Sequence, residues 1–223
     1  MVNMSAAILA NTVSAYSIIF AGLFALALSL TMRPQPFRWS VVYLAISLSG
    51  IASVWHESTG GIFPARIADI CGILFLLWVA QIAVLFDFYS PLFRRMTIAF
   101  AGIINLFSIW LIYSGGAKQI TELIINIPFG KEWGYSLSET IMLVNGALLV
   151  ILIFSRFGAI AVNARPLLYL TSGIFFLGVL LSIPATEDVD FQFLAYHSIW
   201  HIAASYAFIS FWAFNHVRFE KNK

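Results

Sequence analysis

The chain has 223 residues, of which 61% are hydrophobic and only 10% are charged, and its formal net charge is +2. Its mean hydropathy is +0.92. Soluble domains carry about 25% charged residues, so this composition excludes an ordinary soluble protein and predicts an integral membrane protein. The positive charge is small and dispersed, with no basic cluster that would favour nucleic acid as a partner. Cys71 is the single cysteine, which excludes an internal disulfide and a cysteine-rich metal site.

Seven apolar runs follow one another along the chain, at residues 6–31, 39–57, 65–86, 96–114, 136–155, 166–184 and 192–215. Each is close to the length of about 20 residues that an α-helix needs to cross a hydrocarbon core of about 30 Å. Proline, glycine and charged residues separate the runs. The expected fold class is therefore all-α, an integral membrane bundle of seven transmembrane helices that forms a single domain over residues 1–223.

Three further features of the runs and their connections carry expectations. The first run is too long for the core of a cleavable signal peptide and has no basic region before it, so none is expected. Between the fourth and fifth runs, residues 117–130 are amphipathic and fit either a segment at the membrane interface or a plain loop. Gln81 and Asn145 fall inside apolar runs, where hydrogen bonds to neighbouring helices are the simplest explanation.

The distribution of Lys and Arg predicts the orientation in the membrane. Nine of the 12 basic residues fall in the loops after runs one, three and five or in the C-terminal tail, and three fall on the opposite side. Because cytoplasmic loops carry the excess of Lys and Arg, we expect the N-terminus outside and the C-terminus in the cytoplasm. The odd number of expected spans agrees with this orientation. The compact length favours a bacterial inner membrane as the location.

The last apolar run contains two histidines, His197 and His201, among apolar and aromatic residues between Tyr196 and Trp212. A spacing of four places both imidazoles on one helix face, about one turn apart. This geometry allows one helix to give a single metal ion two nitrogen ligands. Histidines inside a membrane are costly and usually mark function. The alternative is a pair of histidines satisfied by hydrogen bonds inside a helix bundle.

Other polar groups are expected near the same end of the bundle. Ser53 and His56 end the second run three residues apart, on one helix face, and Asp69 lies about one turn into the third. With the orientation given by Lys and Arg, these groups and the histidine pair all lie at similar depth near the outer face. Since that orientation is deduced from Lys and Arg alone, the agreement supports a shared site independently.

Three histidines and one open position make up the composition of a catalytic zinc site. Bound zinc activates a water molecule and polarises a carbonyl group. Asp69 could orient that water and accept its proton, and Ser53 could donate a hydrogen bond to a developing oxyanion. Simpler roles stay open. Ser53 could bond to its own helix backbone, Asp69 could pair with Arg66 at the start of its helix, and His56 could be an interfacial histidine without a ligand role.

These residues resemble the CREST superfamily of seven-helix membrane proteins, which includes alkaline ceramidases, progestin and adiponectin-type receptors, and Per1-like lipid-remodelling factors. The similarity is closest to the alkaline ceramidases. The segment GIASVWHEST at 50–59 is similar to their glycine–serine–aromatic–histidine segment, and HSIWHIAASY at 197–206 is similar to their His-x-x-Trp-His-Ile segment. The resemblance covers the layout of seven helices, and the specific motif matches are confined to these segments and Asp69.

The resemblance implies a zinc ion held by His56, His197 and His201, with Ser53 and Asp69 beside the water molecule that the metal activates. It also implies hydrolysis of a lipid amide or ester, with ceramide or another acyl lipid as the substrate.

Two features depart from the ceramidase pattern. The family serine sits four residues before the histidine, whereas Ser53 sits three before His56 and Ala52 occupies the expected position. Both offsets reach the same helix face. The chain has no Asp or Glu before Glu57, so the acidic calcium-binding segment of these ceramidases has no counterpart and calcium control is not expected.

The leading hypothesis is a zinc-dependent intramembrane hydrolase of a lipid amide or ester bond, with its active site towards the outer face. The alternative is a receptor-like or structural seven-helix protein in which zinc stabilises the bundle. A channel or transporter is disfavoured, because the sequence shows no discontinuous helix pair or inverted repeat. Glu139 could border the same cavity or be a charge at the start of its helix. The sequence gives no oligomeric state.

Overall fold

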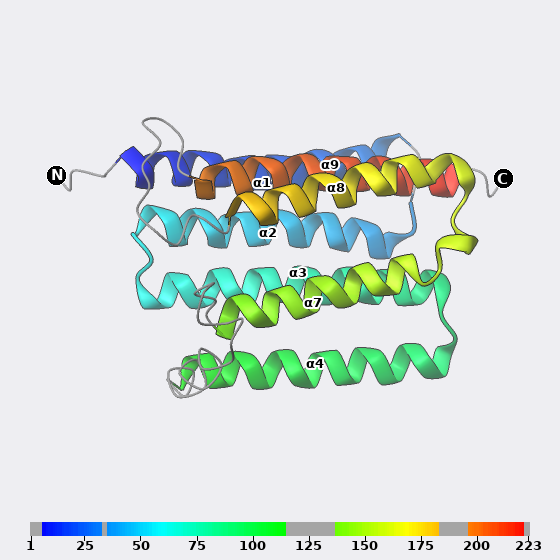
Figure 1. Cartoon of the computed structure of the whole chain (residues 1–223), viewed down its shortest axis with the longest axis horizontal. Helices are drawn as coiled ribbons and strands as arrows, with labels where there is room; N and C mark the ends of the chain where they lie inside the picture. Colours follow the sequence, from blue (N-terminus) through cyan, green and yellow to red (C-terminus); the bar gives the residue numbers. More distant parts are fainter. Residues whose placement is uncertain (1–5, 33–34, 115–136, 183–195, 221–223) are drawn as a thin grey trace. The chain divides into compact units, whose positions relative to one another are not determined.

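The computed structural model describes residues 6–32, 35–114, 137–182 and 196–220, and this part of the chain is helical, without a strand. Its seven α-helices, shown in Figure 1, are α1 (Ala6–Thr31), α2 (Phe37–Ser58), α3 (Phe63–Phe88), α4 (Pro91–Tyr113), α7 (Leu137–Phe154), α8 (Arg165–Ser182) and α9 (Tyr196–Glu220). Two short 3-10 turns, η1 (Phe157–Ala159) and η2 (Val162–Ala164), precede α8. Every apolar run expected from the sequence corresponds to one of these helices, so the all-α class is confirmed.

Four of the helices, α1 to α4, are long and apolar enough to cross a membrane by length and composition. The described part of α7 is a shorter apolar helix over Ile141–Phe154. Large apolar side chains on α4 are exposed, as expected of a surface that faces lipid: Phe100 is 66% exposed and Leu106 69%. The chain is therefore a membrane protein. The number of seven membrane spans and the orientation stay predictions.

By its internal contacts the chain forms two compact units. Unit 1 contains Met1–Gly72 and Phe157–Lys223, and unit 2 contains Ile73–Arg156. The prediction of a single domain over residues 1–223 stays a prediction, and each unit is described by itself. The amphipathic residues 117–130, and the acidic loop before α9, lie outside the residues that the structure describes.

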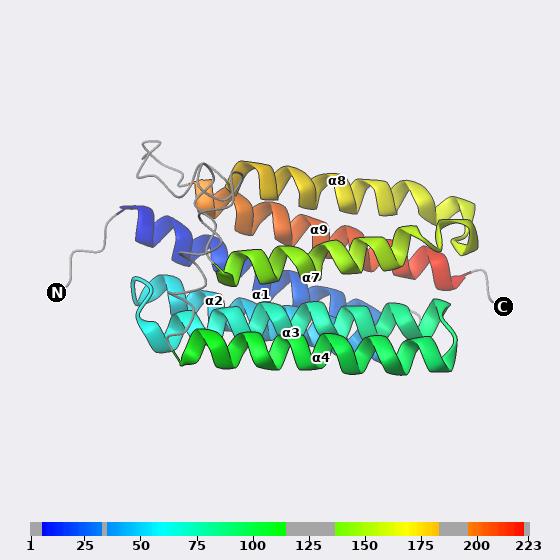
Figure 2. The same cartoon turned by 60° about the horizontal axis from the view of Figure 1, so that its bottom comes forward.

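In unit 1, α1 packs along both α2 and α9, and α8 packs against α9 (Figures 1 and 2). Small residues let α1 and α2 approach closely, as is common between transmembrane helices. A Cβ atom at Gly50 would lie only 2.8 Å from the backbone nitrogen of Ile19. At the end of the unit where α2 begins, Trp39 and Phe211 pack edge to face with ring centroids 5.3 Å apart.

In unit 2, three buried amide side chains join the helices. Gln81 Nε2 donates to the Asn145 carbonyl over 3.0 Å and to Asn145 Oδ1 over 3.3 Å. Asn145 Nδ2 donates in turn to Asn105 Oδ1 over 3.0 Å. The expectation that Gln81 and Asn145 bond to neighbouring helices is confirmed, because these hydrogen-bonded amides connect α3 to α7 and α7 to α4.

The C-terminal end of α2 is fixed by a pair of glycines. Gly60 and Gly61 have φ angles of 65° and 77°, a left-handed conformation that glycine adopts without steric cost. The Gly61 N–H donates to the His56 carbonyl over 2.9 Å, and the Gly60 N–H donates to the Glu57 carbonyl over 3.1 Å. This pairing is a Schellman motif. It satisfies the last carbonyl groups of α2, sets the path towards α3, and holds the backbone of His56 and Glu57 in place.

Candidate metal centre

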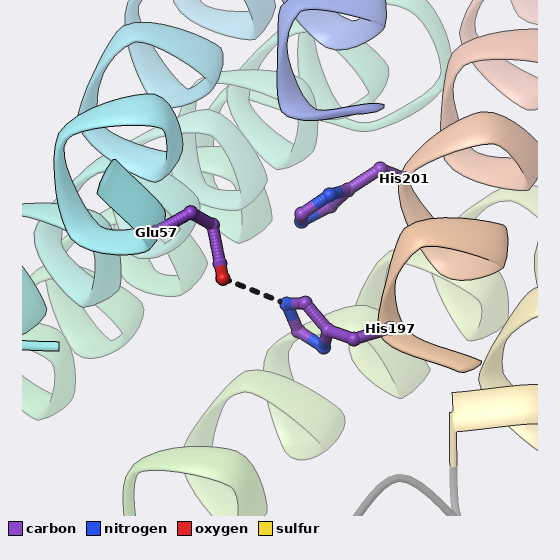
Figure 3. Close-up of side chains that lie close together, drawn as sticks. All are labelled: Glu57, His197 and His201. Carbon is purple, nitrogen blue, oxygen red and sulfur yellow. Dashed lines mark ion pairs between the residues drawn. The ribbon is translucent and has the colours of Figure 1, made fainter. Parts of the chain in front are cut away.

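Three side chains with metal-ligating groups meet in unit 1 where the last turn of α2 lies beside the first turns of α9. They are Glu57 from α2 with His197 and His201 from α9, shown in Figure 3. One ligand atom from each lies within 4.8 Å of the others. Glu57 Oε1 and His197 Nε2 are 3.1 Å apart, close enough for an ion pair when the imidazole is protonated. The two imidazole rings lie nearly perpendicular, with centroids 4.6 Å apart.

One side of the cluster is buried and the other is exposed. His201 is 2% exposed. The Glu57 side chain is 10% exposed, and that of His197 is 40% exposed. The exposed edge of the cluster is therefore at His197, while His201 lies among protein atoms from three helices.

Two serine hydroxyls contact the two nitrogens of the buried His201 ring. Ser14 Oγ, from α1, lies 2.9 Å from His201 Nδ1. Ser53 Oγ, from α2, lies 3.4 Å from His201 Nε2. The expectation that Ser53 shares a site with the histidine pair therefore agrees with its position, since its hydroxyl faces His201 across the interface of α2 and α9.

Asp69 lies in the first part of α3, and its carboxylate is close to the Ser53 hydroxyl. Asp69 Oδ1 is buried and has no hydrogen-bond partner. A buried acceptor without a partner costs about 1–3 kcal/mol, so this oxygen has capacity for a bound water molecule, a proton or a ligand.

His56 is not a member of the three-residue cluster. It is half-buried at the end of α2, and its buried Nδ1 has no hydrogen-bond partner. Its ring lies against the turn, so that a Cβ atom at Gly61 would lie 3.2 Å from His56 Cε1. Neighbouring helix residues point about 100° apart, and it is Glu57 that points at the histidine pair. The ligand role of His56 stays a prediction.

The sequence places Glu57 with Ser53 and His56 at the end of the second run, and we predicted no ligand role for it, although two signals were available. It is the first acidic residue of the chain, at the end of an apolar run, and it follows Ser53 by four residues. Residues four apart, such as Ser53 and Glu57, share a helix face, and so do residues three apart, such as Ser53 and His56. The spacing alone therefore could not choose between His56 and Glu57.

The donor set fits a zinc ion. One carboxylate and two imidazoles make up one of the catalytic zinc ligand sets, which leave a fourth position open. Ligand atoms about 2.0–2.1 Å from a tetrahedral zinc lie about 3.3 Å from one another. The 3.1 Å between Glu57 and His197 already matches this spacing. The widest pair, within 4.8 Å, would have to close by about 1.5 Å, a distance that side-chain rotation covers.

No protein-family model matches the chain, and no curated protein matches its sequence. The resemblance to the CREST superfamily therefore depends on the motifs quoted above, and the chemistry of the site is argued from its own residues.

That chemistry combines a metal-ligating group with a proton acceptor and a hydroxyl donor. The Glu57, His197 and His201 cluster supplies the ligands, and Ser53 and Asp69 lie next to it on the buried side. The Glu139 side chain, at the start of α7 in unit 2, lies outside the side chains that the structure describes, so its expected role stays a prediction.

Proposed function

We propose that the protein is a zinc-dependent intramembrane hydrolase of lipid amide or ester bonds, similar in type to the alkaline ceramidases. The observation that carries the proposal is the convergence, in one buried corner of a membrane protein, of a Glu–His–His ligand set with Ser53 and Asp69. Hydrolysis of an acyl bond can use a bound metal ion, a hydroxyl group that donates a hydrogen bond, and a carboxylate that accepts a proton.

His197 and His201 would hold the metal together with a third ligand from the end of α2. The geometry favours Glu57 as that ligand, and the sequence motif favours His56. A zinc ion bound there would polarise the substrate carbonyl and activate a water molecule for attack.

The chain's own residues would guide the proton and the substrate. In hydrolysis the water oxygen attacks the carbonyl carbon, and the bond to the leaving amine or alcohol breaks. Asp69, whose Oδ1 has no other partner, would accept the proton of the attacking water and pass it to the leaving group. Ser53 would donate a hydrogen bond to the oxygen that becomes negatively charged.

A lipid is the proposed substrate because the site lies at the end of membrane-length helices with apolar surfaces. Ile51 and Trp55, near the same end of α2, are 54% and 46% exposed. These two side chains lie on the opposite face of α2 from Ser53 and Glu57, so they mark the lipid-facing surface beside the site. Ceramide and other acyl lipids fit this description, and the residues of the site do not choose between an amide and an ester.

The distribution of charge supports a site near the outer face of a bacterial inner membrane. At the opposite end of unit 1, Arg218 of α9 lies over the ring of Trp39, with 5.2 Å between the guanidinium carbon and the ring centroid. Arg38 and Arg165 also fall at that end, where α2 and α8 begin. An excess of Arg marks the cytoplasmic side, which leaves the cluster on the other side.

The metal site is tested by elemental mass spectrometry on purified protein prepared without a chelator. We expect about one zinc ion per chain in the wild type and none in His201→Ala, because a ligand set reduced from three to two loses most of its affinity. His216→Ala is the matched control: it removes a histidine from the same helix near its other end, and zinc should stay.

The third ligand is decided in the same experiment. Zinc should be lost from Glu57→Ala and retained by His56→Ala; the reverse result would assign the ligand to His56 and leave the function standing. A folded wild type without metal would remove the hydrolase proposal. Zinc-loaded wild type that releases fatty acid from ceramides or other acyl lipids would support it.

One observation favours the alternative of a structural zinc site in a receptor-like protein. A metal ion held by Glu57, His197 and His201 would cross-link α2 to α9, and the Ser14 contact with His201 adds α1 to the same assembly. This alternative expects the same zinc content but no turnover of any lipid amide or ester by the wild type.

A further inference from the structure

We infer that Ser14 of α1 is a positioning residue that fixes the tautomer of His201, so that Nε2 is the nitrogen available to a metal ion. The inference rests on the proposed metal site and adds a residue from a helix that contributes no ligand. It follows from the two hydrogen bonds of a single hydroxyl group.

Ser14 Oγ has two partners at equal distance. It donates to the backbone carbonyl of Asn11, three residues earlier in α1, over 2.9 Å. It also lies 2.9 Å from His201 Nδ1. Both side chains are buried, since Ser14 is 8% exposed and His201 is 2% exposed. Solvent therefore does not compete for either bond.

A hydroxyl group carries one proton and two acceptor lone pairs. The Asn11 carbonyl can only accept, so the Ser14 hydroxyl is the donor in that contact. In the contact with His201, the hydroxyl oxygen is then the acceptor and the imidazole Nδ1–H is the donor. A neutral imidazole has one N–H, so Nε2 carries the lone pair. Nε2 is the atom that lies towards Ser53 and the cluster.

The opposite tautomer would disable the site. If Ser14 donated to Nδ1, the proton of the neutral ring would sit on Nε2 and point at the position that a metal ion needs. Metal-ligating histidines generally donate their other N–H to an oxygen acceptor, and loss of that acceptor typically lowers metal affinity about 10–100-fold. Ser14 is placed to be that acceptor for His201.

A second set of serine contacts holds α1 against α9 one turn further along. Ser17 Oγ donates to the Ser14 carbonyl over 2.6 Å and lies 2.7 Å from Ser205 Oγ. Ser205 Oγ donates to the His201 carbonyl over 2.7 Å. Ser17 therefore contacts the backbone carbonyl groups of Ser14 and His201 and not the imidazole nitrogens, which makes Ser17→Ala the matched control for Ser14→Ala.

The first arm of the test measures zinc affinity by competition with a fluorescent chelator, on wild type, Ser14→Ala, Ser14→Thr and Ser17→Ala in the same detergent. We expect zinc affinity to fall about 10–100-fold in Ser14→Ala, and to stay near the wild-type value in Ser17→Ala and in Ser14→Thr, which keeps the hydroxyl. Equal affinities in Ser14→Ala and Ser17→Ala would overturn the inference while the proposed metal site stands.

The second arm reads the tautomer directly, by nitrogen NMR of metal-free wild type labelled with ¹⁵N-histidine and assigned with His201→Ala. The His201 ring should show a protonated Nδ1 and an unprotonated Nε2, and Ser14→Ala should lose this preference. A protonated Nε2 in the wild type overturns the inference. This arm needs neither zinc nor a folded Ser14→Ala, so it decides the inference even if wild type binds no metal and the proposed function fails.

Discussion

Asp69 is the residue on which the proposed chemistry depends most. Its carboxylate is close to the Ser53 hydroxyl, and its Oδ1 is buried without a hydrogen-bond partner. Native structures contain few such atoms, and each one calls for an explanation. A structural role would use both oxygens for hydrogen bonds, whereas a proton acceptor needs one of them available to the reacting water.

We therefore expect Asp69→Asn to lower kcat for lipid hydrolysis about 10²–10⁴-fold, the usual contribution of a general base, while zinc content stays near the wild-type value. The amide has the same shape as the carboxylic acid but cannot accept the proton. Asp87→Asn, the same change at the other end of α3, is the control and should leave turnover unchanged. Loss of zinc together with activity in Asp69→Asn would make Asp69 a metal ligand instead.

At the scale of the element, the end of α2 positions both ligand candidates. Gly60 has a left-handed backbone, and a Cβ atom there would meet no atom within 4 Å. Any cost of adding a side chain at this position is therefore conformational and does not arise from a clash. The carbonyl groups that the turn satisfies are those of His56 and Glu57, so a strained turn acts directly on the backbone of the site.

Gly60→Ala should lower the free energy of unfolding by about 1–2 kcal/mol, the cost of a left-handed conformation for a residue with a Cβ atom. Unfolding in mixed micelles with increasing SDS measures this change. Gly158→Ala is the control, because a Cβ atom there also meets nothing within 4 Å and its φ is not positive. Equal stability of the two variants would show that the Gly60 conformation is not needed.

The helices themselves were largely predictable, because hydrophobic run length fixes where a membrane helix can lie. Their ends were less so. The fourth run was expected from residue 96, but α4 begins at Pro91. Proline is favoured at the first helical position, and Arg94 is accommodated over the ring of Phe86, 3.9 Å from its centroid. A hydropathy pattern assigns Arg94 to a loop, because it contains no information about the contact with Phe86.

The candidate site was predictable as a region and not as a ligand set. The spacing of His197 and His201 indicated a shared helix face, and Ser53 was expected near them, as the 3.4 Å to His201 agrees. The choice between His56 and Glu57 depends on the rotation of α2 about its axis. That rotation is set by the packing of α1 against α2 at Gly50 and by the terminal turn, which no single-sequence pattern contains.

For the whole molecule, the orientation in the membrane can be tested with single cysteines in a Cys71→Ser background. Ser58→Cys, next to the cluster, should react with a membrane-impermeant maleimide added to cells that have lost the outer membrane but keep the inner membrane closed. Gly158→Cys, before α8, should react only after the inner membrane is opened, because the Lys and Arg distribution places it in the cytoplasm. Both sites are exposed. The opposite pattern would invert the topology and place the cluster on the cytoplasmic side.

Unit 1 joins the beginning of the described chain to its end, and this has a consequence for biosynthesis. Glu57 and Ser14 are synthesised with α2 and α1, long before α9 emerges from the ribosome with His197 and His201. The cluster can close only once α9 has packed beside α1. Until then α2 carries a carboxylate at its end without its imidazole partner, so assembly of the site waits for the synthesis of α9.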